Sequence, residues 1–286
     1  KLERGDASVS FGAWYMYKSQ SYEFPQFSNA TSATTDAAGN PVRRDAYAHT
    51  LDLWSRYQTK RFRFEVELAG IVGQIANAAT DANGAALGPV LLRQFGGAAQ
   101  ADWSLASGKF HLGGEVGFAS GDRSPGFGNR PARGCTTTPC QAGVIDGPQF
   151  SPKDGVQDIR NFRFNPAYRV DLILWREILQ GVTDAFYLKP TARYELIEGV
   201  SATASLIYSQ AIYASSTPST TSTPLGVELD LGLAYHSDDG FVAFVNYGVL
   251  QPLDGLGYGS AGAPATAPQG SLARGHAIRS GVAVKF

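Results

Sequence analysis

The chain has 286 residues, and its 24 Lys and Arg nearly balance its 25 Asp and Glu. That balance gives no electrostatic basis for a nucleic-acid surface. No run of about 18 apolar residues occurs, which excludes a membrane-spanning helix. Charged residues make up only 17% and aromatic residues reach 12%, which suits a chain that turns every second side chain toward a polar interior.

Ten segments alternate apolar and polar side chains with the two-residue period of a β-strand. In chain order they span residues 8–19, 46–57, 61–70, 91–105, 110–118, 186–196, 200–208, 227–235, 241–249 and 274–286. The clearest alternation is RFRFEVEL, in which Phe62, Phe64 and Val66 alternate with Arg63, Glu65 and Glu67. An even number of crossings brings both ends of the chain to the same side.

The connections between these segments predict a particular kind of sheet. Long loops at residues 20–45, 77–89, 121–160, 214–223 and 253–273 alternate with turns of a few residues. Bacterial outer-membrane barrels have short periplasmic turns and long external loops, and the closing strand here ends on an aromatic residue, Phe286. We therefore predict an all-β fold: one transmembrane antiparallel up-and-down β-barrel of about 10–12 strands in a single domain over residues 1–286.

One further segment also alternates but does not fit the count. Residues 162–174 (FRFNPAYRVDLIL) would make eleven crossings and leave the C-terminus on the wrong side. Either the segment extends a long external or inward-folded loop region over residues 121–181, or another strand lies within residues 121–160. The first alternative is preferred, because residues 121–160 show no good alternation.

The first residues and the two cysteines bear on the compartment. Residues 1–6 (KLERGD) lack the apolar core of a secretory signal, so either a signal has been removed or the chain begins partway through a larger protein. Cys135 and Cys140 bracket TTTP in a polar loop, a spacing that in an oxidising compartment favours a small disulfide over a metal site.

The parity of Phe286 assigns one face of each strand to lipid and the other to the lumen. A polar face with both signs of charge is typical of a pore that guides a polar solute, but equally of a small barrel plugged by its own ion pairs. The predicted pore-lining residues are Asp52, Arg56, Arg63, Glu65, Glu67, Asp102, Glu115, Lys189, Arg193, Glu195, Glu228, Asp230, Arg279 and Lys285.

Catalysis is the competing class, and the sequence does not favour it. An outer-membrane hydrolase needs a nucleophile or an activated water beside a placed base. None of the four histidines lies in a recognisable motif, and His49 and His276 fall on the lipid parity. We expect no enzyme, no catalytic residue, no metal and no cofactor.

Three short motifs carry a resemblance to a known family. They are GFASGD at residues 117–122, FNPAY at residues 164–168 and Lys189-Pro190 in a later strand. In this order, over residues 110–215, they resemble outer-membrane channels of the alginate-export type. The resemblance implies an eighteen-stranded barrel that conducts an anionic polysaccharide through an arginine-rich lumen, with FNPAY in an external loop.

Two features depart from that family. The chain is too short for eighteen strands, so it would be the C-terminal part of such a barrel, completed by further strands. Its lumen set is mixed in charge, which leaves four residues of the loop region as candidates for the constriction: Arg163, Arg169, Asp171 and Arg176.

The function expected from these features is a passive outer-membrane channel or porin that passes polar solutes or exports an anionic polysaccharide. The runner-up is a structural or lipid-organising barrel with a blocked lumen. Expected partners are outer-membrane lipid and lipopolysaccharide, a polar or anionic solute, and further strands or a periplasmic partner.

Overall fold

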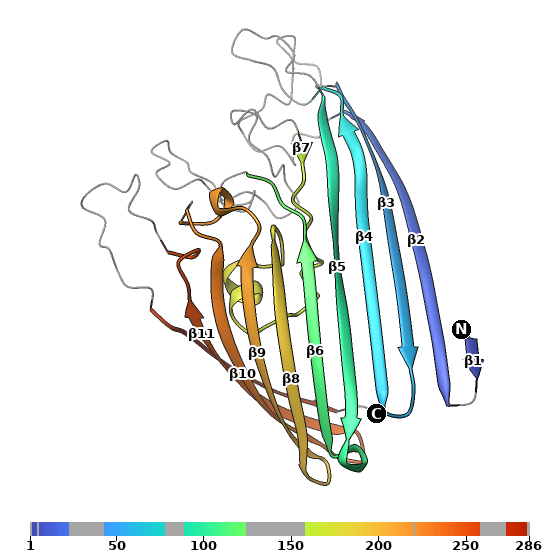
Figure 1. The fold of residues 1–286 in the computed structure, drawn as a ribbon, viewed down its shortest axis with the longest axis vertical. Coiled ribbons are helices and arrows are strands. Elements are labelled where there is room, and N and C mark those ends of the chain that lie inside the picture. Colours follow the sequence, from blue (N-terminus) through green and yellow to red (C-terminus); the bar gives the residue numbers. More distant parts are fainter. Residues whose placement is uncertain are drawn as a thin grey trace.

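The computed structural model describes residues 2–4, 6–22, 43–77, 89–123, 158–219, 221–257 and 273–284. Within them the chain forms one antiparallel sheet in which each main strand pairs with the next along the sequence (Figure 1). The strands in this order are β1 (Leu2–Arg4), β2 (Ala7–Tyr22), β3 (Arg43–Gln58), β4 (Phe62–Ile75), β5 (Val90–Leu105), β6 (Phe110–Ala119), β8 (Ala185–Ile197), β9 (Val200–Ala211), β10 (Pro224–His236), β11 (Phe241–Pro252) and β12 (Gly275–Val284). The predicted all-β, up-and-down antiparallel architecture is confirmed.

Each of the ten predicted segments corresponds to a strand, the last of them described as far as Val284, and most strands extend beyond the predicted bounds at the long-loop end. The short connections gather at the opposite end of the sheet, where residues 59–61, 198–199 and 237–240 turn the chain (Figure 1). Between β5 and β6 the turn is a 3₁₀ helix, η2 (Ala106–Gly108). Strands β1 and β12 stand at the two ends of the pairing order, and the described residues contain no pairing between them.

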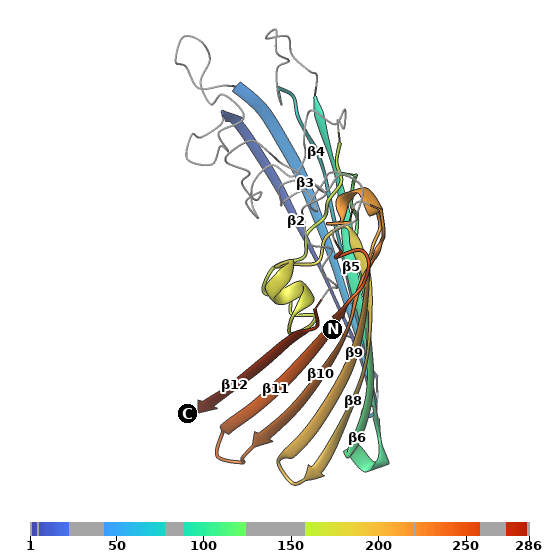
Figure 2. The ribbon, with the colours of Figure 1, turned by 90° about the vertical axis from the view of Figure 1, so that its left-hand side faces the viewer.

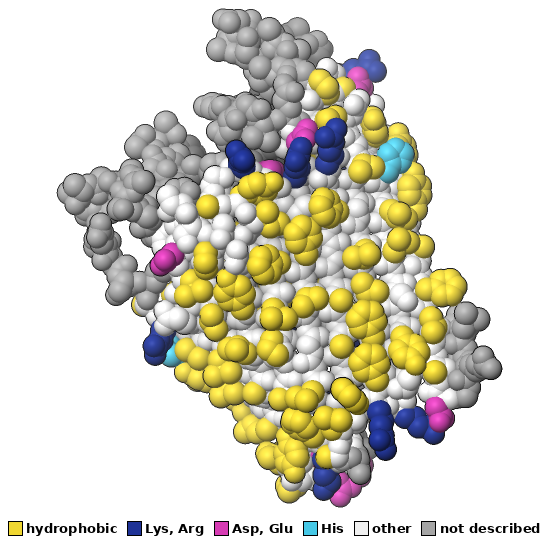
Figure 3. All heavy atoms as spheres, in the orientation of Figure 1, with side chains coloured by type: hydrophobic (Ala, Val, Ile, Leu, Met, Phe, Trp, Pro, Cys, Tyr) yellow, Lys and Arg dark blue, Asp and Glu magenta, His cyan; other side chains and the backbone are white. Residues whose placement is uncertain are grey.

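The two faces of the sheet differ sharply, because neighbouring strands keep their apolar residues in register. The outward face carries large exposed hydrophobic side chains on every long strand, spread over the surface seen in Figure 3. Leu68, Leu112, Leu188 and Leu231 are examples, each more than 40% exposed. The Lys, Arg, Asp and Glu side chains that this view shows lie toward the ends and margins of the face.

Aromatic side chains form two bands on the outward face. Near the short turns lie the ring pairs Tyr57–Phe62, Phe110–Tyr194 and Tyr235–Phe241, with centroids 6.3–6.4 Å apart. Toward the long loops lie Phe95–Phe118, Phe186–Tyr208, Tyr247–His276 and the rings around His49. We call these the short-turn band and the long-loop band.

The two bands are eight residues apart on three strands and six apart on β11, where Phe241 and Tyr247 belong to them. His49 and Tyr57 are eight residues apart on β3, and so are Phe110 and Phe118 on β6 and Phe186 and Tyr194 on β8. Eight residues of extended chain cover about 27 Å along the strand. Aliphatic side chains fill the interval, so the outward face has an apolar zone bordered by aromatic rings.

Residues 158–184 form an inner segment on the concave side of the sheet (Figure 2). It begins with β7 (Asp158–Ile159), parallel to β5, and contains a short π-helix, η5 (Leu174–Ile178). Residues 162–174 therefore do not form a crossing strand, although their side chains alternate. In the described ranges, no helix is long and apolar enough to cross a membrane.

The buried core lies between the inner segment and the sheet. The segment contributes Phe164, Leu174 and Trp175, which pack with inward-facing strand residues such as Tyr187 and Leu250. The Tyr187 ring lies across Gly117 of the neighbouring strand, at the place where a Cβ would stand. A glycine at this position lets the aromatic ring lie flat on the backbone.

We predict that Gly117→Ala lowers the free energy of unfolding by about 1–3 kcal/mol, the usual cost of overpacking. The added methyl group would push Tyr187 out of its contact with the inner segment. Gly114→Ala is the matched control on the same strand, because nothing lies within 4 Å of the added Cβ there. Equal denaturation curves for the two variants would contradict this role of Gly117.

Candidate functional site on the inner face

Thirteen of the fourteen predicted pore-lining residues share the inner face of the sheet, and Lys285 lies outside the described residues. The register shows this directly: Arg56 pairs with Glu65, Glu65 with Gln100, Gln100 with Glu115, and Glu115 with Lys189. One row of polar residues therefore crosses five strands. Opposite charges directly across a strand pair stabilise the sheet.

Several of these charges are paired with one another. Glu65 accepts hydrogen bonds from Trp54 Nε1 at 2.7 Å and from Arg56 Nη2 at 2.9 Å, and Arg63 Nε donates to it at 3.0 Å. The Arg56 guanidinium also lies over the Trp54 ring, 5.0 Å from its centroid. On β3 and β4, the predicted alternative of mutual ion pairing therefore describes the geometry well.

Glu228 anchors the inner segment to the sheet. Its side chain is only 1% exposed, and its carboxylate accepts the backbone N–H groups of Leu172, Ile173 and Leu174 at 3.0, 2.8 and 3.0 Å. These donors lie immediately before and at the start of η5, where backbone N–H groups have no partner within the helix. Glu228 faces the inner segment and does not line open space.

Other strands hold the segment along its length. Lys189 Nζ on β8 donates to the Val170 carbonyl at 2.6 Å, and Trp175 Nε1 donates to Ser209 Oγ on β9 at 2.9 Å. Tyr168 OH donates to Glu115 on β6 at 2.8 Å, and Tyr187 OH donates to the same carboxylate. Burial, the largest cause, raises the pKa of Tyr168 to about 12.

The three motifs of the family resemblance meet at the beginning of this segment. Ser120 of GFASGD donates from Oγ to the Arg160 carbonyl at 2.6 Å, and its own carbonyl accepts from Phe162 N at 2.9 Å. In FNPAY, Asn165 closes a turn by accepting from Ala167 N and Tyr168 N. Together with Lys189, these residues fix the path of the segment across β5, β6 and β8.

Asp171, a predicted constriction residue, has a different place. It is 4% exposed, and its carboxylate accepts from the backbone N–H groups of Trp175 and Arg176, so it caps η5. Burial and the nearby Glu228 raise the pKa of Asp171 to about 7, against the effect of those two amides. The sequence had made this residue a candidate for the constriction, but its side chain is buried beneath the inner segment's helix and does not face open space.

Arg169 and Arg176, two of the other constriction candidates, lie near Arg279 of β12, the last strand of the sheet. Burial and the positive charges of Arg279 and Arg169 lower the pKa of Arg176. Glu177 lies among them, accepting from Arg279 Nη1 at 3.1 Å and standing 3.7 Å from Arg176 Nε. We call Arg169, Arg176 and Arg279 the arginine cluster. Arg163 lies elsewhere, at an isolated bridge to Thr183.

A polar depression lies farther toward the short turns. It has a volume of about 380 Å³, and its lining includes Arg63, Asp102, Glu115, Lys189 and Arg193. Both signs of charge meet there, three basic side chains with two acidic ones. The inner face therefore offers two polar surfaces, the arginine cluster on and beside the segment and this mixed depression below it.

Three of the four histidines contact neighbouring groups within the described residues. His111 has Asp102 at 3.0 Å on Nδ1 and the Gly108 carbonyl at 3.1 Å on Nε2, so both ring nitrogens are engaged. His49 and His276 contact Tyr15 and Tyr247 on the outward face. No group of three or more His, Cys, Asp and Glu able to hold a metal ion occurs in the described ranges. Cys135 and Cys140, the predicted disulfide, lie outside them.

Sequence reasoning did not single out Tyr168, Trp175, Glu177 and Tyr187, which link the segment to the sheet or to the arginine cluster. The available signal was the concentration of aromatic residues over residues 162–175, which include Phe162, Phe164, Tyr168 and Trp175. No protein-family model matches the chain, and no curated protein matches it at a significant level.

Removing the anchor should release the inner segment. We predict that Glu228→Ala leaves three buried N–H groups without an acceptor, at a cost of about 1–3 kcal/mol each. Trypsin should then cleave after Arg169 and Arg176 at least tenfold faster than in the unchanged protein. Glu195→Ala, on the same face but outside these contacts, is the control, and equal cleavage rates in both variants would reject the anchor.

Protonation of Asp171 should stabilise the docked inner segment, because it removes a buried negative charge near Glu228. Because its pKa of about 7 lies above the ordinary value of about 3.9, the folded state binds the extra proton between those values. The resulting stability is complete below pH 4 and is lost as the pH rises through 7. We expect the Trp175 and Arg176 amides to exchange roughly tenfold faster at pH 8 than at pH 5, after correction for intrinsic rates. Asp171→Asn should flatten this dependence, and an unchanged slope in that variant would assign it to another group.

Proposed function

We propose that the chain forms a passive channel of the porin type in the bacterial outer membrane. Its solutes are polar, and an anionic polysaccharide in export is the favoured case. The sheet closes into a barrel in the membrane, either through its own end strands or with further strands. The wall contacts lipid and lipopolysaccharide, and transport needs no cofactor.

The observation that carries this proposal is the pair of aromatic bands on an otherwise aliphatic outward face. Transmembrane barrels have an outward apolar zone about 25 Å tall between two girdles of aromatic residues. The eight-residue interval between bands spans about 27 Å along the strands before any tilt is taken into account. Water would disfavour so many exposed Leu, Phe, Tyr and Trp side chains, whereas acyl chains would favour them.

The inner face supports solute passage and suggests where selection occurs. Arg169 and Arg279 lie close enough to Arg176 for their charges to lower its pKa, and Glu177 places an exposed carboxylate beside Arg176 and Arg279. Guanidinium groups bind carboxylates and sulfates in paired hydrogen bonds. The resemblance to alginate-export channels points the same way, toward an acidic sugar polymer as the solute.

A blocked structural barrel is the second candidate, and one observation favours it. The inner segment packs on the sheet with a continuous buried core, so it is a fixed part of the wall and occupies part of the interior. In that case the arginine cluster would bind no solute. Conductance separates the two candidates.

We predict stable open steps when the protein is inserted in a planar bilayer, with anions preferred over cations. Arg169→Ala with Arg279→Ala should lower the anion-to-cation permeability ratio at least twofold, because both substitutions remove exposed positive charge from the interior. An acidic oligosaccharide should block the unchanged channel and lose most of its effect on the variant.

Arg163→Ala is the matched control, since it removes an arginine of the same segment outside the cluster. If it changes selectivity as much as the double variant does, the cluster is not the selective element. If the protein inserts into the bilayer but conducts no ions, the channel proposal is wrong and the blocked structural barrel is favoured.

A further inference from the structure

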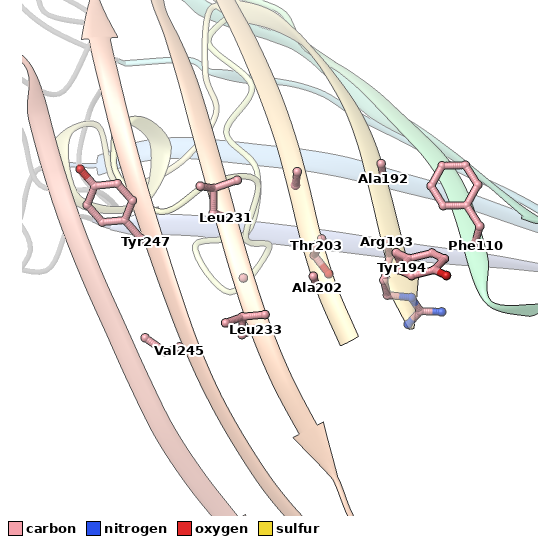
Figure 4. A pocket seen from close by; sticks show the side chains of 12 residues that line it. Phe110, Ala192, Arg193, Tyr194, Ala202, Thr203, Leu231, Leu233, Val245 and Tyr247 are labelled. Carbon is pink, nitrogen blue, oxygen red and sulfur yellow. The ribbon is translucent and has the colours of Figure 1, made fainter. Parts of the chain in front are cut away.

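An apolar groove lies on the outward face across β6, β8, β9, β10 and β11. Its volume is about 520 Å³, within the range of roughly 300–1,000 Å³ found for small-molecule sites. Figure 4 shows Phe110 and Tyr194 at one side of it and Leu231, Leu233 and Tyr247 toward the other. Arg193, the one charged residue in its lining, belongs to the inward parity of β8, so the outward surface of the groove is apolar.

The groove exists because small side chains meet in register. Ala192 on β8 pairs with Ala204 on β9, and Tyr194 pairs with Ala202 one step farther along. On β10, Leu231 and Leu233 stand opposite Ala204 and Ala202. Three alanines therefore form a floor between larger apolar walls.

The position of the groove indicates what fills it. It begins at the Phe110–Tyr194 pair of the short-turn band, crosses the aliphatic zone and reaches Tyr247 of the long-loop band. It is thus continuous with the surface that the proposed function assigns to lipid. In that orientation acyl chains are the apolar molecules beside it.

We propose that this groove binds one acyl chain of a phospholipid from the surrounding bilayer. The chain lies over Ala192, Ala202 and Ala204 between the aromatic pair and the leucines of β10. It crosses β8 and β9, neighbouring strands that lie about 4.8 Å apart. This inference rests on the proposed membrane location but not on conductance or on the identity of the solute.

The test uses the purified, delipidated protein in mild detergent with 1-palmitoyl-2-oleoyl phosphatidylethanolamine as the probe. Native mass spectrometry should show one retained lipid. Ala192→Phe with Ala204→Phe should lower its retention at least tenfold by filling the groove. Ala13→Phe, at an exposed outward alanine of β2, should leave retention unchanged. Ala204→Leu gives a milder filling should the double variant fold poorly, and an intermediate loss is expected for it.

The outcomes separate this inference from the proposed function. Equal retention in the groove-filling and control variants would overturn the acyl-chain site. So would a protein dimer that the groove-filling variants dissociate without loss of lipid, since that would assign the groove to a second copy. Flotation of the protein with liposomes tests the membrane location itself: protein that stays unbound refutes the channel, whereas protein that floats but retains no lipid refutes only the groove.

Discussion

The structure depends most on one buried carboxylate, that of Glu228. A polar side chain in a protein interior is costly unless hydrogen bonds satisfy it. Here three successive backbone N–H groups do so, and the same contact supplies acceptors for donors that a helix start would otherwise leave unpaired. The sheet therefore supplies the acceptor for three backbone N–H groups of the inner segment, and the segment supplies the donors for the buried carboxylate of the sheet. The hydrophobic core between them forms around this fixed point.

The inner face is held together differently in its two halves. On β3 and β4, Arg56 and Arg63 satisfy the carboxylate of Glu65 locally. Farther along the sheet, Glu115 and Lys189 bond to the inner segment. The first of these regions is held by ion pairs within the sheet, and the second by a packed layer of the segment on the strands.

The strands and their faces could be predicted from sequence because the two-residue period is a local property. In RFRFEVEL, eight residues are enough to distinguish the apolar face of the strand from the polar one. The same two-residue period correctly assigns Arg279, on the last strand, to the inner face. The inner segment could not be predicted so well, because its alternation imitates a strand while Asp171 caps a helix. The arginine cluster could not be predicted from local sequence patterns. Glu177 and Arg279 are 102 residues apart in the chain, and the curvature of the sheet brings them together.

The contacts of the inner segment also set an order of assembly. The segment is made before β10 and β12, yet its anchor, Glu228, lies 54–56 residues later, and the partner of Glu177 lies later still. Closing such loops costs entropy before any contact compensates for it, so long-range pairings form late. The contacts of the segment with Glu228 and Arg279 can therefore form only after β10 and β12 have joined the sheet.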